Sequence, residues 1–152
     1  MRVSAKADYA VRAAIELAVA GGAQPLTAEV VAQRQQIPVQ FLQKILHELR
    51  RARLVASQRG PDGGHWLARS PREITVADIM RAIEGPLASV RGAPPEALHY
   101  AGAAVPLQEV WIALRTNVRS VLEGVTLADL AASRLPRRIA TLAHNPESWV
   151  TR

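Results

Sequence analysis

The sequence has 152 residues, 49% of them hydrophobic, which is enough apolar side chain for one folded domain with a small extension. It contains no cysteine, so a disulfide framework, a cysteine-ligated zinc site and a cysteine-ligated iron–sulfur cluster are excluded. The formal net charge is +6 and it is uneven: residues 1–75 carry eleven lysines and arginines against six acidic residues, and residues 76–152 carry eight against seven. A basic front half favours a polyanionic partner such as nucleic acid, with a solvated basic surface as the alternative.

The sequence gives no sign of membrane targeting. No segment approaches the roughly 18 uninterrupted apolar residues of a membrane span. Asp8, Arg12 and Glu16 interrupt the apolar residues near the start, which is not the pattern of a signal peptide. We expect a cytoplasmic protein with no membrane partner.

The first part of the chain has the pattern of three short helices. Ser4 is expected to cap a first helix that ends at Gly21 and Gly22, and Thr27 to cap a second that runs to about residue 35. Pro38 opens a third helix, because the missing N–H of proline costs nothing in a first turn. The apolar residues of this third helix have the spacing of one buried stripe: Leu42, Ile45, Leu46 and Leu49. Two short helices joined by a tight turn, the second with a polar face, form a helix-turn-helix.

A β-hairpin is predicted directly after these helices. Residues 54–58 and 65–68 have the composition of two short strands, and the loop between them is rich in glycine and other turn residues. A hairpin at this position is a wing, so the sequence predicts a mainly α fold with a small β-hairpin, a winged helix-turn-helix. A fourth helix is expected to begin at Thr75 and to stop at Gly85. We assign residues 1–84 to a DNA-binding domain.

The polar face of the third helix suits the major groove of DNA. The side-chain amides of Gln40 and Gln43 each offer a donor and an acceptor, which matches adenine. Arg59, at the tip of the hairpin, has the charge to enter a narrow minor groove. Candidate contacts to the DNA backbone are basic, hydroxyl or glycine residues of the same region: Lys6, Lys44, Arg50, Ser57, Gly60 and Gly63. Taken singly, each of these residues has the alternative of being an ordinary solvated surface group.

The second half of the chain is predicted to contain a long loop and a long helix. Residues 85–104 are irregular and too long for an ordinary connector, so we interpret them as a sensor-type loop or a mobile segment. Residues 105–132 are predicted to form a long helix, begun by Pro106 and almost five turns in length, and a short closing helix. Residues 133–152 are expected to be a polar tail that is partly disordered.

One apolar stripe follows the long helix as far as Val125, and its members are Leu107, Val110, Trp111, Leu114, Val118, Val121 and Leu122. The N-terminal domain could cover part of this stripe, but a second copy of the chain would cover it better. The stripe therefore predicts a dimerisation helix.

Few residues suggest chemistry other than DNA binding. His99 and Tyr100 in the loop and Trp111 on the long helix are candidates for a small-molecule pocket, with packing as the alternative role of Trp111. The four histidines do not share metal-ligand spacing, so no metal site is predicted. The sequence shows no nucleophile with a base and no pair of acids, so we do not expect an enzyme.

Four segments together resemble the signature of the Rrf2 family of bacterial transcription regulators: residues 37–46, 49–55, 57–64 and 67–69. The start of the chain and the segments 74–76, 83–86 and 125–130 are similar to the family too, so the resemblance covers about residues 1–132. It implies a homodimer that binds a palindromic operator in double-stranded DNA, usually as a repressor, with the long helix forming the dimer. By position, Gln40 and Gln43 would read bases, Arg59 would enter the minor groove, and Tyr9 and Ser57 would contact the DNA backbone.

The sequence departs from the family in two places. Many members bind an iron–sulfur cluster through three cysteines in the loop before the dimer helix, and residues 87–104 have none, so no cluster is expected and the effector is unknown. His65 stands at a wing position that is usually tyrosine, which is expected to alter packing more than recognition. Two alternatives stay open beside simple repression: a small-molecule effector that releases DNA, and control through docking to a partner enzyme.

Overall fold

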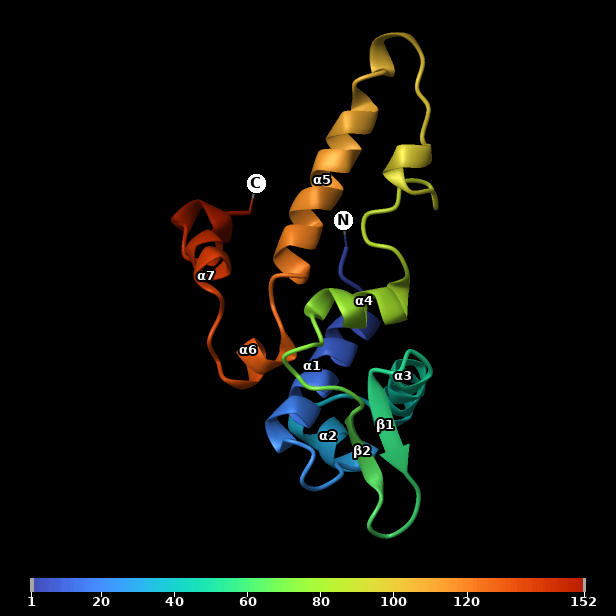
Figure 1. Ribbon diagram of the computed structural model, residues 1–152, viewed down its shortest axis with the longest axis vertical. Coiled ribbons are helices and arrows are strands. Elements are labelled where there is room, and N and C mark those ends of the chain that lie inside the picture. Colours follow the sequence, from blue (N-terminus) through green and yellow to red (C-terminus); the bar gives the residue numbers. More distant parts are fainter. Residues whose placement is uncertain (1, 152) are drawn as a thin grey trace.

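The computed structural model describes residues 2–151 and has the element order of a winged helix-turn-helix (Figure 1). Its N-terminal part consists of α1 (Ala5–Ala20), α2 (Ala28–Gln35), α3 (Val39–Arg51), β1 (Val55–Gln58), β2 (Gly64–Leu67) and α4 (Val76–Glu84). The prediction of a mainly α fold with a small β-hairpin is confirmed, and the two strands form an antiparallel pair.

The predicted helix caps are present. The Ser4 side chain accepts a hydrogen bond from the backbone N–H of Ala7 at 3.0 Å, and the Thr27 side chain accepts one from Val30 at 3.3 Å. Such caps satisfy backbone donors that a first turn leaves without partners. Gly21 ends α1 in the left-handed conformation, with φ +69°, which glycine adopts without strain. Pro38 lies just before α3 as its capping residue, one position earlier than predicted.

The core of this domain forms around α1, which packs against α3, α4 and β2. The predicted stripe of α3 is buried in full: Leu42, Ile45, Leu46 and Leu49 are each at most 1% exposed. From α4, Ile79 belongs to the same core, and Met80 is also buried. Because each large apolar side chain contributes about 1.5–3 kcal/mol when fully buried, this stripe fixes the rotation of α3 and so decides which face of α3 meets solvent.

The wing is attached to the rest of the domain by a β-bridge between Leu26 and His65. β1 pairs with β2 from Val55–Leu67 to Gln58–Gly64. β1 begins one residue later than predicted, and β2 lies one residue earlier in the chain than predicted. Leu26, between α1 and α2, forms an antiparallel bridge with His65, with backbone N–H···O distances of 2.9 and 2.7 Å. The turn requires glycine at position 63, because a Cβ atom there would lie 2.2 Å from the carbonyl oxygen of Gln58. The hairpin is therefore anchored at its base and tightly turned at its tip.

The C-terminal part begins with a loop that contains two short 3-10 turns, Pro95–Ala97 and Gly102–Ala104, followed by α5 (Leu107–Leu122) and α6 (Leu127–Ala131). In Figure 1, α5 and its loop rise away from the N-terminal domain. The prediction that the helix continues to Val125 is wrong. Its sixteen residues span about 24 Å, and Glu123 and Gly124 end it before Val125 enters the core.

The segment after α5 returns to the N-terminal domain. The backbone oxygen of Val125 accepts from Val76 at 3.0 Å, and the N–H of Leu127 donates to the carbonyl of Ile74 at 2.9 Å. Leu127 is fully buried, and α6 packs against α1. This closing helix is predicted together with the dimerisation helix, but Leu127 and Ala131 pack in the core of the first domain. Periodicity could not show this, because the pairing joins segments about fifty residues apart.

The tail that was predicted to be partly disordered is helical over most of its length. It forms α7 (Arg137–Ala143) and a 3-10 turn, Pro146–Trp149. The indole N–H of Trp149 donates to the carbonyl of Ala143 at 2.6 Å, which folds the turn back onto the end of α7. Ile139 reaches toward the end of α5, where its Cδ1 atom lies 3.9 Å from the position of a Cβ on Gly124. Within residues 2–151, no helix is long and apolar enough to cross a membrane.

Candidate nucleic-acid interface

The solvent-facing side of α3 is polar and basic. Gln40, Gln43 and Lys44 are exposed, as the periodicity predicts, because the opposite face supplies the core. Glu48, the one acidic residue of α3, forms an ion pair with Lys6 of α1, with Nζ and Oε1 2.8 Å apart. Since this pair neutralises the acid, the exposed face of α3 presents net positive charge.

A hollow of about 460 Å³ lies between α3 and the wing. Arg50 crosses it: its Nη1 atom donates to Ser57 Oγ at 3.2 Å, and its Nη2 atom lies 3.3 Å from His47 Nδ1. The helix and the hairpin both contribute to the lining, which is Gln43, Leu46, His47, Arg50, Ser57, Arg59 and His65. Four residues that the sequence proposed separately as DNA contacts, Gln43, Arg50, Ser57 and Arg59, thus meet around one concave surface.

Other predicted DNA contacts lie on the same two elements but do not line this hollow. Gln40 and Lys44 lie on the exposed side of α3, and Gly60 and Gly63 are in the turn of the wing. Gly60 has φ +109°, a conformation suited to glycine.

On the α1 side of the recognition helix, Tyr9 is half-buried. Its ring meets Phe41 of α3 edge to face, with ring centroids 5.7 Å apart. The guanidinium of Arg12 lies 5.3 Å from the centre of the Tyr9 ring. Lys6 and Tyr9 therefore both contact α3, through Glu48 and Phe41.

His65 has a more central position in this region than the sequence predicts. It pairs across the hairpin with Ser57, and cross-strand partners share one face of a sheet. Its side chain is half-buried, and Nδ1 is enclosed with no hydrogen-bond partner among residues 2–151. Burial and the positive charge of Arg50 lower the pKa of His65 below its usual value, while Glu29 acts in the opposite direction. The imidazole is therefore neutral at pH 7. The sequence signal that could have indicated this position is the hairpin register, which pairs His65 with Ser57.

The residues proposed for a small-molecule pocket are only partly brought together. The Trp111 indole N–H donates to the Tyr100 hydroxyl at 3.0 Å, which ties the loop to α5. His99 is exposed. The hollow that Trp111 borders, about 350 Å³, is lined instead by residues 88–91 and Leu114.

The loop also binds α5 through polar contacts. Arg115 forms an ion pair with Glu96, and the Gln108 side-chain amide donates to the carbonyl oxygens of Pro95 and Leu98, at 3.2 and 2.7 Å.

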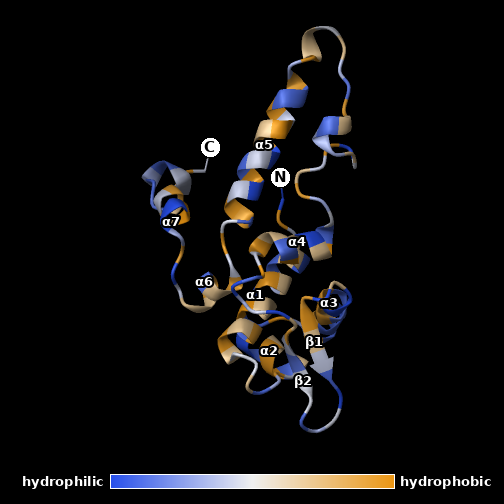
Figure 2. Ribbon diagram, in the orientation of Figure 1, coloured by the Kyte–Doolittle hydropathy of each residue, from blue (hydrophilic) through white to orange (hydrophobic). Residues whose placement is uncertain are grey.

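The apolar stripe of α5 is largely open. None of its sixteen residues, all within the described part of the chain, is fully buried. Val110 and Leu114 are 53% and 44% exposed. The other members of the predicted stripe are half-buried, namely Leu107, Trp111, Val118, Val121 and Leu122. Figure 2 shows hydrophobic segments recurring along the projecting helix.

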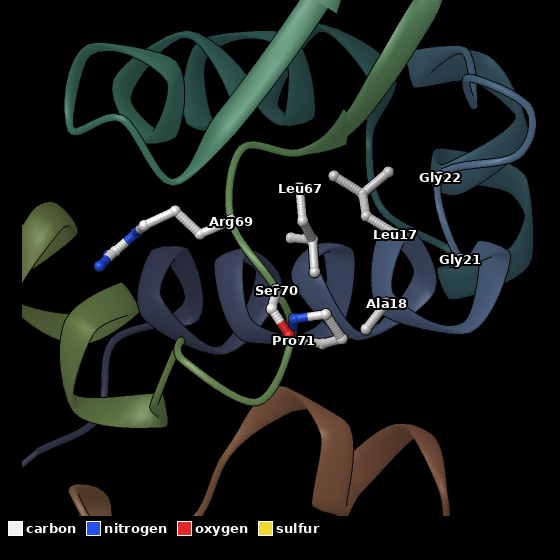
Figure 3. Close-up of a pocket in the computed structure, with 8 residues that line it drawn as sticks. All are labelled: Leu17, Ala18, Gly21, Gly22, Leu67, Arg69, Ser70 and Pro71. Atoms are coloured by element: carbon white, nitrogen blue, oxygen red, sulfur yellow. The ribbon is translucent and has the colours of Figure 1, made fainter.

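A second concave surface lies at the end of α1 and has a different character (Figure 3). It measures about 340 Å³, and its lining includes Leu17, Leu67 and Pro71 beside Gly21 and Gly22. The side chain of Arg69 extends away from the other side chains drawn there. This apolar hollow offers little to a nucleic acid, so the interface is assigned to the α3–wing side.

A helix-turn-helix whose second helix has a buried stripe and an exposed polar and basic face, followed by a β-hairpin wing that carries Arg59, defines the class of winged-helix DNA-binding proteins. The sequence model of the Rrf2 family, described as an iron-dependent transcriptional regulator, matches residues 3–133, and the chain belongs to this family.

Relatives and solved structures agree with the assignment. The chain is 51% identical to the HTH-type transcriptional regulator Rv1287 of Mycobacterium tuberculosis over 143 residues, which are 94% of this chain and 89% of that protein. It is 37% identical to the regulator CymR of Bacillus subtilis, covering 87% of this chain and 91% of the relative. The CymR structure, titled as the global cysteine regulator of B. subtilis, superposes with a TM-score of 0.75 at 35% identity, over 88% and 98% of the two chains. IscR of T. potens gives a TM-score of 0.69 at 31% identity, over 100% and 93%.

The residues present do not fit the iron chemistry in the family description. The chain has no cysteine to supply thiolate ligands. Among residues 2–151, no group of three histidine, aspartate or glutamate side chains gathers closely enough to hold a metal ion.

Proposed function

We propose that this protein is a homodimeric, sequence-specific DNA-binding repressor that acts in the cytoplasm on a palindromic operator. The observation that carries the proposal is the hollow in which Gln43, Arg50, Ser57 and Arg59 meet between α3 and the wing. A helix of this kind enters the major groove while a wing lies against the adjacent minor groove. The same surface therefore supplies base readers and phosphate contacts.

The residues divide by chemistry. The exposure of Gln40 and Gln43 on α3 supports a role for their amides in bidentate pairing with adenine edges. Arg59 extends the wing toward a narrow minor groove, where negative potential is concentrated. The remaining contacts position the protein on phosphates without reading sequence: Lys6, Tyr9, Lys44, Arg50, Ser57, Gly60 and Gly63.

The open stripe of α5 supports the dimer. A second copy offers the same stripe, and burying exposed groups such as Val110 and Leu114 stabilises association. In a two-fold dimer the two α3 helices reach half-sites about 34–36 Å apart, or a multiple of that spacing, which is why the operator is expected to be a palindrome.

Regulation without an iron–sulfur cluster belongs to the same proposal. The hollow beside Trp111 and residues 88–91 supports a small organic effector, because the loop that forms it is tied to the dimer helix by Gln108 and Arg115. A ligand there that favours the folded chain raises its melting temperature, which a thermal-shift screen measures.

The test of DNA recognition is selection of genomic fragments by the purified protein, followed by sequencing. We expect enrichment of one palindrome, weaker binding by Arg59→Ala, and altered base preference in Gln43→Ala. Arg137→Ala is the matched control, since it removes an exposed cation from α7, far from α3 in Figure 1. Binding that is only salt-sensitive, with no enriched sequence and no effect of Arg59→Ala or Gln43→Ala, would contradict the proposal.

A further inference from the structure

The hollow between α3 and the wing has a consequence for DNA geometry, which rests on the proposed docking. The major groove and the neighbouring minor groove of a duplex are separated by one sugar–phosphate backbone. If α3 occupies the first groove and the wing the second, that backbone has to cross the hollow between them. The lining is suited to it, with the guanidinium of Arg50 beside the Ser57 hydroxyl and two imidazoles, His47 and His65, at its walls.

We propose that this hollow seats a DNA phosphate, and that His65 is a neutral donor to that phosphate through its Nε2–H, beside Arg50 and Ser57. The argument for the donor atom is structural. Nδ1 is enclosed without a partner, whereas Nε2 is not among the enclosed, unpaired atoms of residues 2–151. A proton on Nδ1 would bury an unsatisfied N–H, so the single proton of the neutral ring belongs on Nε2.

The backbone of His65 holds the ring in place. Its N–H donates to Leu26 and its carbonyl accepts from the N–H of Leu26, at 2.7 and 2.9 Å. Ser57 faces it across the hairpin, and Arg50 joins Ser57 from α3. The donor is thus fixed relative to two other groups suited to phosphate, which is what a positioning contact requires.

The charges around His65 keep it neutral in the free protein. Arg50 on α3 disfavours a second positive charge, Glu29 on α2 favours it, and Arg59 and His47 also line the hollow. Burial of the ring acts in the same direction as Arg50, and together they hold the pKa of His65 below its usual value. A phosphate would itself favour a charged ring, but Nδ1 is enclosed without an acceptor in the free protein, which disfavours a second proton. His65 therefore contributes a hydrogen bond and displaces no counterion of its own.

The first experiment compares His65→Phe, which keeps a ring without a donor, with His65→Gln, which keeps an N–H donor. Because phosphates carry no sequence information, we expect His65→Phe to weaken operator and non-operator DNA alike, by about tenfold. The salt dependence of binding should stay that of the wild type, since no cation is removed. His65→Gln should bind within about threefold of the wild type. Unchanged binding by His65→Phe, or equal losses in both variants, would overturn the donor role.

The second experiment identifies the acceptor. Operator duplexes carry a neutral methylphosphonate at one phosphate at a time. At the seated phosphate the wild type should lose affinity, and His65→Phe should lose less than the wild type, because only the contacts of Arg50 and Ser57 remain to be removed. If the two losses simply add at every position, His65 acts on the wing and not on a phosphate. Imidazole nitrogen NMR of the free protein should show a proton on Nε2, and a proton on Nδ1 would also overturn the proposal.

The proposed docking and the role of His65 fail in different ways. If the docking is wrong, Arg59→Ala and Gln43→Ala leave DNA binding unchanged. If only the phosphate seat is wrong, those variants still weaken binding or alter base preference while His65→Phe does neither.

Discussion

Substitution of Arg50 by glutamine tests whether the hollow faces a phosphate. Arg50 is exposed, and its contacts are with the Ser57 hydroxyl and the His47 ring, so no acidic group is left unpaired by the change. Exposed polar contacts of this kind contribute little to folding, and the melting temperature should stay close to that of the wild type. The effect should therefore appear in DNA binding alone.

The magnitude follows from counterion release. Each neutralised phosphate contributes about 0.9 to the slope of log K against log salt, and a two-fold dimer loses two such contacts, so the slope should become shallower by about 1.8. Between 50 and 200 mM salt the wild type should then lose roughly 12-fold more affinity than the variant does over the same range. Fluorescence anisotropy titrations of a labelled operator at four salt concentrations measure both slopes. A slope equal to that of the wild type, with Arg137→Gln as the matched control, would refute the placement of Arg50 against the backbone.

Three other predictions concern the fold and its assembly. Leu127→Ala should destabilise the protein by about 2–5 kcal/mol in urea unfolding, because α6 is part of the core, whereas Leu142→Ala, at a side chain 51% exposed, should cost less than about 1 kcal/mol. Leu114→Glu should shift the dimer toward monomer in analytical ultracentrifugation, and Thr116→Glu, on the opposite side of α5, should not; equal effects would argue against the apolar stripe as the interface. The pKa of His65 is lowered on folding, so the unfolded chain binds more protons near pH 6. This contribution to stability is therefore present above the unfolded pKa of about 6.5 and is lost as pH falls toward the folded value, and His65→Gln should flatten that dependence in urea titrations at pH 7.5 and 5.5.

The helices of the N-terminal domain depend on interactions between residues close together in the chain. For that reason they could be predicted from the sequence. The caps at Ser4 and Thr27 depend on hydrogen bonds within three residues. The stripe from Leu42 to Leu49 depends only on helical spacing, and it fixes Gln43 on the outer face. Once the outer face is known, the type of side chain indicates the chemistry that it offers to DNA.

The parts that were mispredicted depend on contacts between distant segments. The end of α5 is set by Val125, whose carbonyl accepts from Val76, and periodicity along one helix contains no information on that pairing. The tail was judged by its polar composition, yet Ile139 packs toward Gly124 and α7 forms there. His65 was judged as a packing residue, although the register that places it opposite Ser57 brings it to the wall of the hollow.

The junction between the N-terminal domain and α5 sets the orientation of α5 relative to that domain. Thr75 and Thr126 form an antiparallel bridge, and each also begins a helix with a capping box, through Asp78 for α4 and Asp129 for α6. Beside this bridge, Arg81 of α4 forms an ion pair with Glu123 at the end of α5.

The first residues of α4 and α6 are joined by backbone hydrogen bonds, and both helices pack against α1. The orientation of α5, which lies directly before α6 in the chain, is therefore restrained relative to α1. In a dimer joined through α5, the distance between the two α3 helices is therefore set at this junction. An effector beside Trp111 would act on operator spacing by way of α5 and the Thr75–Thr126 bridge, and a loop far from α3 would in this way govern the proposed recognition of DNA by α3.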